Sequence, residues 1–216
     1  MTQKDWEVYK FGGTSMKNAG ALKQVGNLIM NSDSDNLIVV VSAMSGMTDD
    51  LLSFSQTKDG KLLEAIESRY IETVGSLLKD SSGEHRLIEE FRQDIQKIKD
   101  LAEQKDHSSM NVEENEILGF GEIWSSKMLH DYLTSLSDIK SSWINPMEFL
   151  VIRNQEMGAN VNWSKSKEAF NQRFQDMEGK IIMGGFIASD EEGRPTNLGR
   201  NGSDYSASIL GSLSES

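Results

Sequence analysis

A lysine followed closely by two glycines and two hydroxyl residues lies near the start of the sequence, in Lys10-Phe-Gly-Gly-Thr-Ser15. Glycines leave backbone N–H groups open to an anion because no Cβ shields them, and the lysine adds a positive charge. An apolar β-favouring run precedes this segment and a helical pattern follows it, the usual setting of a phosphate-binding turn. The spacing is not that of a Walker A loop, and a surface lysine is the alternative. We predict that phosphate is bound by Lys10, Gly12, Gly13 and Ser15.

A second candidate anion site lies in Leu198-Gly-Arg-Asn-Gly-Ser-Asp-Tyr205. This Gly-rich segment runs into a helical pattern, whose N-terminus provides free N–H groups and the positive end of the helix dipole. Arg200 can bind a carboxylate through two parallel hydrogen bonds. Ser203 is predicted to be the N-cap of the helix and Asp204 a first-turn acid, and both roles are compatible with ligand binding.

Glu122 is a candidate partner for a positively charged group. On a helix over residues 111–136 it shares a face with apolar and small residues, where a carboxylate is expected to have a partner. Gly119 and Gly121 weaken that helix by roughly 1 kcal/mol each, which indicates close approach by another element. A glutamate at the rim of the helix, bonded to nearby backbone, is the alternative.

Hydroxyl residues follow a buried strand in Ser42-Ala-Met-Ser-Gly-Met-Thr48. Ligands of open α/β sheets gather at the carboxyl ends of strands, so Ser42 and Thr48 are candidate binding residues, with helix capping as the alternative. No cluster of histidines and acids has the spacing of metal ligands, and no protein metal site is predicted.

The order of apolar patterns predicts an α/β fold. Trp6–Phe11, Asn18–Met30 and Leu37–Val41 read as a strand, a helix capped by Asn18 and a strand, which together form a βαβ unit. Residues of about 60–137 form successive helical stripes with no strand between them, which indicates a helical insertion.

Further strands are predicted at 139–144 and 180–188, followed by a hairpin turn at 190–193. We therefore predict a three-layer αβα sandwich on a mainly parallel sheet. In that fold four loops meet along one edge of the sheet, at 10–15, 42–48, 184–190 and 198–204.

The composition is that of a globular protein. Of 216 residues, 37% are hydrophobic and 26% are charged, and the net charge is −12, which argues against a nucleic-acid or membrane binder. The absence of cysteine excludes disulfides and thiolate metal sites. No apolar run approaches the roughly 18 residues of a membrane span, and the N-terminus lacks a signal-peptide pattern, so a cytoplasmic location is expected.

These segments together resemble the aspartokinases, the aspartate kinase branch of the amino-acid kinase family. The resemblance follows the whole chain in order and is carried by Lys10–Ser15, Val41–Thr48, Gly121-Glu122, Gly185–Ile187 and Leu198–Ser206. It implies that the 4-carboxylate of L-aspartate is phosphorylated by ATP with Mg²⁺, giving 4-phospho-L-aspartate, the first step toward lysine, threonine and methionine. It also implies a homo-oligomer for the full-length protein.

The resemblance implies roles for single residues. Lys10 would neutralise the transferring phosphoryl group, Asp204 would organise that lysine, and the backbone at Gly12 and Gly13 would contact phosphate. The residues expected to bind aspartate are Ser42, Thr48, Glu122 (the ammonium), Phe186 (through its backbone), Arg200 (the α-carboxylate) and Ser203. Asn201 departs from the more usual glycine, a change that some members share.

In this family a nucleotide-binding half and, usually, ACT domains follow the segment at 198–206. We therefore expect residues 1–216 to be the aspartate-binding N-terminal part of the kinase domain, ending before the nucleotide-binding half and transferring little or no phosphate alone. Two alternatives remain: a non-catalytic aspartate-binding module, and a kinase for another acidic amino acid. Acetylglutamate fits less well because it lacks the free ammonium that Glu122 would bind.

Overall fold

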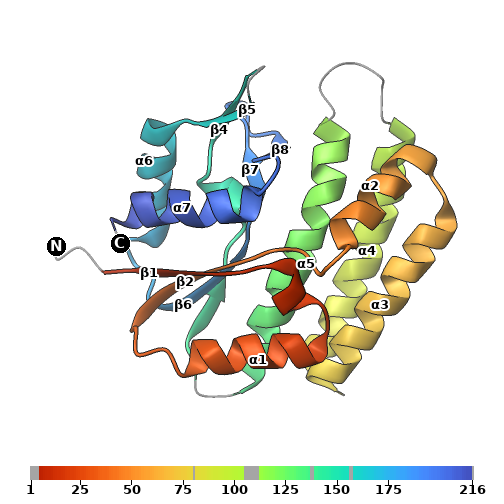
Figure 1. Ribbon diagram of the computed structural model, residues 1–216, viewed down its shortest axis with the longest axis horizontal. Helices are drawn as coiled ribbons and strands as arrows, with labels where there is room; N and C mark the ends of the chain where they lie inside the picture. Colours follow the sequence, from red (N-terminus) through yellow and green to blue (C-terminus); the bar gives the residue numbers. More distant parts are fainter. Residues whose placement is uncertain (1–4, 80, 105–111, 137–138, 156–157, 216) are drawn as a thin grey trace.

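The centre of the molecule is a four-stranded parallel sheet in the order β1-β2-β6-β3 (Figure 1). The computed structural model describes residues 5–79, 81–104, 112–136, 139–155 and 158–215. The sheet strands are β1 (Glu7–Phe11), β2 (Asn36–Val41), β3 (Ser141–Trp143) and β6 (Gly179–Gly184). Two antiparallel hairpins accompany the sheet, one formed by β4 (Ile152–Gln155) and β5 (Gly158–Val161), the other by β7 (Ile187–Ser189) and β8 (Pro195–Asn197).

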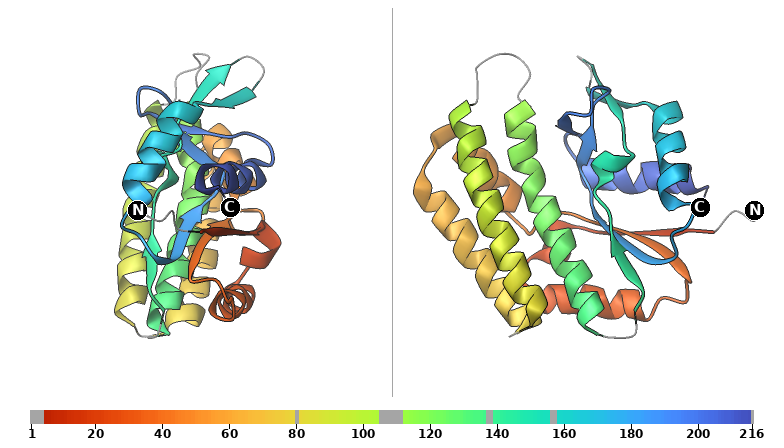
Figure 2. Two further views of the ribbon diagram at one scale, coloured as in Figure 1. Left: turned by 90° about the vertical axis from the view of Figure 1, so that its left-hand side faces the viewer. Right: turned by 180° about the vertical axis from the view of Figure 1, so that it is seen from behind.

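Helices cover both faces of the sheet, which confirms the predicted three-layer α/β sandwich (Figures 1 and 2). One face carries α1 (Ala19–Met30) and α5 (Val112–Ser135), and the other carries α6 (Trp163–Phe174) and α7 (Gly202–Ser214). Beyond α5 lie the remaining helices, which are α2 (Met47–Thr57), α3 (Gly60–Leu78) and α4 (Ser82–Gln104). Two short 3-10 helices, η1 (Gly13–Met16) and η2 (Pro146–Glu148), complete the described elements.

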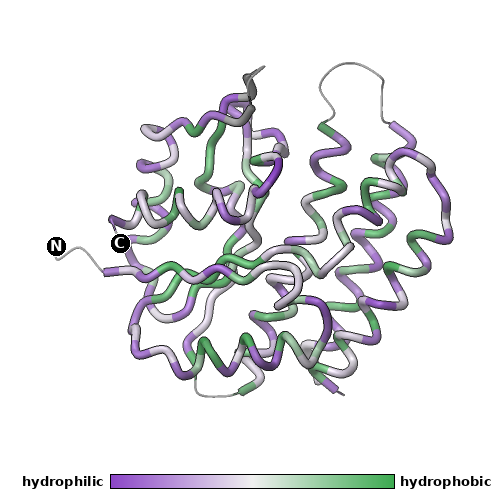
Figure 3. Tube along the Cα trace, viewed as in Figure 1, coloured by the Kyte–Doolittle hydropathy of each residue, from purple (hydrophilic) through white to green (hydrophobic). Residues whose placement is uncertain are grey.

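The central strand β2 joins the two hydrophobic cores. Val39 and Val41 point into the core beneath α1 and α5, whereas Ile38 and Val40 point into the core beneath α6 and α7. All four are fully buried, which explains the continuous β-branched run in the sequence. Figure 3 shows hydrophobic residues concentrated along these central strands.

Three consecutive helices fill the segment predicted as a helical insertion, and α5 also forms one layer of the sandwich. An aromatic cluster joins the three: the rings of Tyr70 in α3 and Phe91 in α4 stack with centroids 4.0 Å apart, and Phe91 lies 4.6 Å from Trp124 in α5. Such ring pairs each contribute about 1 kcal/mol beyond the area they bury. They hold α5 against the outer helices and so fix its position on the sheet.

Two strand predictions differ from the structure. Residues 180–188 are not one strand, because β6 ends at Gly184 and the chain turns at Phe186, where φ is +66°, before β7 begins. The strand predicted at 139–144 is confined to Ser141–Trp143. The hairpin predicted at 190–193 is confirmed as the turn between β7 and β8. Within the described residues, no helix is both long enough and apolar enough to cross a membrane.

The carboxyl ends of three parallel strands are in register. Phe11 of β1 pairs with Val41 of β2, which pairs with Gly184 of β6. The loops that follow these strands therefore leave the sheet at the same edge, as the sequence predicted.

The contact between α1 and α5 can be tested with two glycines of α1. A Cβ at Gly26 would lie 2.6 Å from the ring of Tyr132 in α5, whereas a Cβ at Gly20 would meet only the Asn18 side chain, at 3.5 Å. Gly26→Ala should destabilise the fold by about 1–3 kcal/mol through overpacking, and Gly20→Ala should stabilise it by up to about 1 kcal/mol through helix propensity. Urea unfolding of both variants measures the difference, and equal effects would contradict this packing.

Candidate active site

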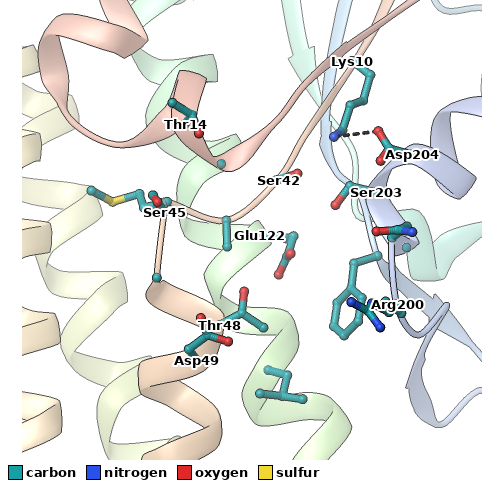
Figure 4. Close-up of a pocket in the computed structure, with 18 of the residues that line it drawn as sticks. Lys10, Thr14, Ser42, Ser45, Thr48, Asp49, Glu122, Arg200, Ser203 and Asp204 are labelled. Carbon is teal, nitrogen blue, oxygen red and sulfur yellow. Dashed lines mark ion pairs between the residues drawn. The ribbon is translucent and has the colours of Figure 1, made fainter.

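The loops at the carboxyl edge of the sheet, together with α5, line an open cavity of about 560 Å³ (Figure 4). Its lining contains nine residues that the sequence proposed: Lys10, Gly13, Ser42, Thr48, Glu122, Phe186, Arg200, Ser203 and Asp204. Glu122 lies centrally in this view, with Thr48 and Asp49 on one side and Arg200 and Ser203 on the other. The four predicted loops therefore do meet, and α5 supplies the floor between them.

Lys10 and Asp204 form an ion pair at the rim of the cavity. Lys10 Nζ lies 2.7 Å from Asp204 Oδ1, with 24% of the lysine side chain and 65% of the aspartate side chain exposed. The pair joins the end of β1 to the first turn of α7. An exposed pair adds little to stability, so its main effect is to hold the lysine amine at the cavity.

The predicted phosphate-binding turn is only partly in the lining. Gly13 and Thr14 line the cavity, whereas Gly12 and Ser15 do not. Gly12 is the N-cap of η1, and a Cβ there would lie 3.5 Å from Lys10 Nζ, so its backbone adjoins the amine. The Ser15 N–H donates to the Gly12 carbonyl at 2.9 Å and is used in forming the turn itself.

Glu122 is a buried carboxylate with an unused acceptor. The residue is only 4% exposed, and Oε2 has no hydrogen-bond partner among the described residues. Burial raises the pKa of the Glu122 carboxyl from its ordinary value of 4.5 to about 8, although hydrogen bonds with the backbone of Ala43 and of Glu122 lower it. A buried charge normally has a partner, so this oxygen is suited to a cationic group that enters the cavity.

Small residues allow α5 to approach the sheet closely enough to place Glu122 in the cavity. A Cβ at Gly121 would lie 2.9 Å from the Cβ of Ala43, and a Cβ at Gly184 would lie 2.8 Å from the Cβ of Glu122. The close approach inferred from the glycines of this helix is therefore confirmed. Ser125 strengthens the contact, because its hydroxyl donates to the Ser42 carbonyl at 2.7 Å.

The Arg200 loop is a tight turn that leaves the guanidinium free. The Gly202 N–H donates to the Gly199 carbonyl at 3.0 Å, and Asn201 has a φ of +59°. Turns of this shape favour glycine or asparagine at that position, which explains the departure from the usual glycine. Arg200 is exposed and has no ion-pair partner among the described residues.

The prediction that Ser203 is the N-cap of the last helix is wrong. The N-cap of α7 is Asn201, without a side-chain hydrogen bond, and Ser203 lies one residue inside the helix. The left-handed backbone at Asn201 starts the helix earlier than the serine pattern suggests. Ser203 is buried and lines the cavity, so its hydroxyl is available to a ligand instead of a cap.

Phe186 lines the cavity and has a strained backbone conformation. With φ at +66°, it sits in a tight turn in which the Ile187 N–H donates to the Gly185 carbonyl at 2.7 Å. Its own N–H donates to the Ser206 hydroxyl at 2.9 Å, and its carbonyl accepts from Leu198. Such conformations persist only where surrounding contacts impose them, and they are frequent at ligand sites.

Several lining residues were not among the predicted site residues, notably Thr14, Ser45 and Asp49. Thr14 lies in η1, Ser45 in the loop after β2 and Asp49 in the first turn of α2, all close to predicted site residues, so the segments, though not these residues, could be found from the sequence. The loop over 42–49 is also held from outside, because Arg69 of α3 donates to the Ser45 carbonyl at 3.2 Å and pairs with Asp50 at 3.3 Å.

The fold and the cavity define an α/β protein whose cavity, at the carboxyl ends of parallel strands, carries a lysine, an arginine and a buried glutamate. The profile of the amino acid kinase family matches residues 5–215, and the chain belongs to this family.

The curated relatives confirm the resemblance to aspartokinases. The chain is 32% identical over 219 residues to the chloroplastic bifunctional aspartokinase/homoserine dehydrogenase 2 of Arabidopsis thaliana, covering 96% of this chain and 24% of that protein. It is 28% identical over 207 residues to the lysine-sensitive aspartokinase 3 of Escherichia coli, covering 94% of this chain and 45% of that protein. The chain therefore spans 24% and 45% of the length of these two relatives.

Among solved structures, E. coli aspartokinase III in complex with lysine and aspartate matches with a TM-score of 0.85 and 25% identity. The same enzyme in complex with aspartate and ADP matches with a TM-score of 0.84 and 24% identity, and here the match covers 97% of this chain and 47% of that chain. The α/β fold inferred from the sequence is thus that of known aspartokinases.

The raised pKa of Glu122 predicts a pH-dependent stability. Because the pKa is about 8 in the folded chain and 4.5 ordinarily, the contribution of this carboxyl to stability is complete below about pH 4.5 and is lost as the pH rises toward 8. Glu122→Gln removes this dependence. The free energy of unfolding of the variant should therefore rise relative to that of the unsubstituted chain by about 1 kcal/mol per pH unit between about pH 5 and 8.

Urea titrations of both proteins at several pH values measure this gain. A difference in the free energy of unfolding that stays constant with pH would show that Glu122 is already ionised in the folded chain.

Proposed function

We propose that the cavity binds L-aspartate and presents its side-chain carboxylate for phosphorylation by ATP, as the first step of lysine, threonine and methionine biosynthesis. The observation that carries the proposal is the buried Glu122 carboxylate, whose Oε2 lacks a partner among the described residues, in a cavity that Arg200 also lines. A carboxyl group and a guanidinium that line one cavity suit the ammonium and carboxylate of an α-amino acid. The aspartate named with the E. coli structures supports this choice of ligand.

The arrangement supports one orientation of the ligand. The α-ammonium would take the unused acceptor of Glu122, and the α-carboxylate would accept two hydrogen bonds from Arg200. The side-chain carboxylate would then extend toward the rim, where Lys10 lies. There the amine would stabilise the negative charge that builds up as a carboxylate oxygen attacks the γ-phosphorus and ADP leaves.

The phosphate side has fewer protein groups. Lys10 and the open backbone at Gly12 and Gly13 would hold the transferring phosphoryl group. Mg²⁺ prefers oxygen ligands, usually one or two carboxylates together with phosphates and water, and Asp49 and Asp204 are the lining carboxylates available besides Glu122. When bound, the ion would neutralise phosphate charge. These groups fit the requirements of phosphoryl transfer, which depends on positioning and charge neutralisation.

Two other functions are compatible with parts of the cavity. A binding module would use Glu122 and Arg200 but would not need Lys10 beside open backbone. A kinase for glutamate would need the same two groups, Glu122 and Arg200, and a greater distance from them to Lys10. Calorimetry with L-aspartate and L-glutamate separates the two kinases, and ATP binding by a longer chain that also binds L-aspartate would exclude the module. Normal turnover by the 216-residue chain would overturn the expectation that it is inactive alone.

One arginine and one lysine substitution test the two proposed halves of the cavity separately. Arg200→Ala should weaken L-aspartate binding by about ten-fold or more, because a charged hydrogen-bonding partner of the α-carboxylate is lost. Lys10→Ala should change that affinity much less and, in a longer chain that binds ATP, abolish phosphate transfer. Isothermal calorimetry and a coupled kinase assay measure the two effects. Equal loss of aspartate affinity in both variants would contradict a phosphate role for Lys10.

A further inference from the structure

A hydrogen bond between two asparagines connects the two sides of the cavity. The Asn197 Nδ2 group, at the end of β8, donates to Asn115 Oδ1, in the first turns of α5, at 2.6 Å. The two residues lie 82 positions apart in the sequence, and both are half-buried. This contact therefore joins the strand that leads into the Arg200 loop to the helix that carries Glu122.

On the helix side, the connection lies on the face that lines the cavity. Asn115 precedes Glu122 by seven residues, which is two helical turns and about 10 Å along the axis, so the two side chains share a face of α5. Leu118, between them on that face, also lines the cavity. The neighbouring Gly119 lies against the β7–β8 hairpin, since a Cβ there would be 2.7 Å from Ile187.

On the loop side, the same amide shapes the Arg200 turn. Asn197 Oδ1 accepts a hydrogen bond from the Gly199 N–H at 2.9 Å. Because a backbone N–H can only donate, this bond fixes the orientation of the amide and directs Nδ2 toward Asn115. Gly199 then begins the turn that contains Arg200 and closes at Gly202. One side chain therefore defines the start of the turn and attaches it to α5.

We propose that the Asn115–Asn197 pair is a positioning device that sets the spacing between Glu122 and Arg200, and so selects ligands that carry an ammonium and a carboxylate on the same carbon. This inference rests on the proposed function, in which Glu122 binds the ammonium and Arg200 the carboxylate. The exposed Arg200 has no ion-pair partner of its own among the described residues, so its place depends on how the turn is held. Neither asparagine lines the cavity, and both act through their neighbours.

The two ends of the pair can be distinguished by one chemical change. Asn197→Asp keeps the acceptor for Gly199 but removes the donor, and places a carboxylate oxygen against Asn115 Oδ1. Asn115→Asp keeps the acceptor for Asn197. L-aspartate affinity, measured by calorimetry on the 216-residue chain, should fall about five-fold in Asn197→Asp and be retained in Asn115→Asp. Asn171→Asp, on the exposed face of α6, controls for the added charge and should leave the affinity unchanged.

A second measurement separates positioning from a general loss of structure. In a chain that already carries Arg200→Ala, Asn197→Asp should cause no further loss of L-aspartate affinity, because the group that the pair positions is absent. A five-fold loss in that background as well would show that the substitution acts through the fold and would overturn the proposal.

Equal affinities of Asn197→Asp and Asn115→Asp for L-aspartate would overturn the positioning role while leaving the aspartate site intact. Failure of the unsubstituted chain to bind L-aspartate would overturn the proposed function, and the positioning role with it.

Discussion

The burial of one carboxylate without a partner is the constraint on which the cavity depends. Glu122 is almost fully buried, and its Oε2 has no partner within the described ranges of the chain. The other charged residues that line the cavity are Lys10 of β1, Asp49 of α2, and Arg200 and Asp204 at α7. None of these lies within ion-pair distance of Glu122 in the part of the chain that the structure describes. Burying a carboxyl group without a partner costs stability, and in exchange the cavity provides an acceptor suited to an ammonium group.

The architecture places this acid by bringing a helix unusually close to a sheet. Gly121 and Gly184 permit the approach, and the Ser125 hydroxyl joins α5 to the end of β2. The outer helices hold α5 from the other side through the rings of Tyr70 and Phe91, both of which contact Trp124 of α5. The helices that follow α2 therefore contribute to the site, since α5 supplies the floor of the cavity and α3 and α4 support α5.

The sequence predicted those features that depend on local pattern. The β-branched run of β2, the glycines and hydroxyls after the strands and the acid on the apolar face of α5 each have a local signature, and they indicated the fold and about half of the lining. The break at Phe186 could not be predicted, because it is imposed by hydrogen bonds with Leu198 and Ser206. The start of α7 was misplaced for a similar reason, since the left-handed backbone at Asn201 overrides the serine cap.

Side-chain contacts between distant segments could not be predicted from sequence patterns either. The contact of Asn115 with Asn197 exists only because the hairpin folds back on α5, and no periodicity indicates it. The helix α5 is buried around most of its circumference, so the apolar face that singled out Glu122 did not indicate the full contact with the sheet.

The most direct test of the central claim is the proton count that accompanies ligand binding. With a pKa of about 8, Glu122 is mostly protonated in the free chain at neutral pH, and an ammonium placed on it would favour the ionised form. Calorimetry of L-aspartate binding near neutral pH, in buffers of different ionisation enthalpy, should therefore show release of close to one proton per site, and Glu122→Gln should abolish that release. Binding with no proton release, or release that persists in Glu122→Gln, would contradict the account.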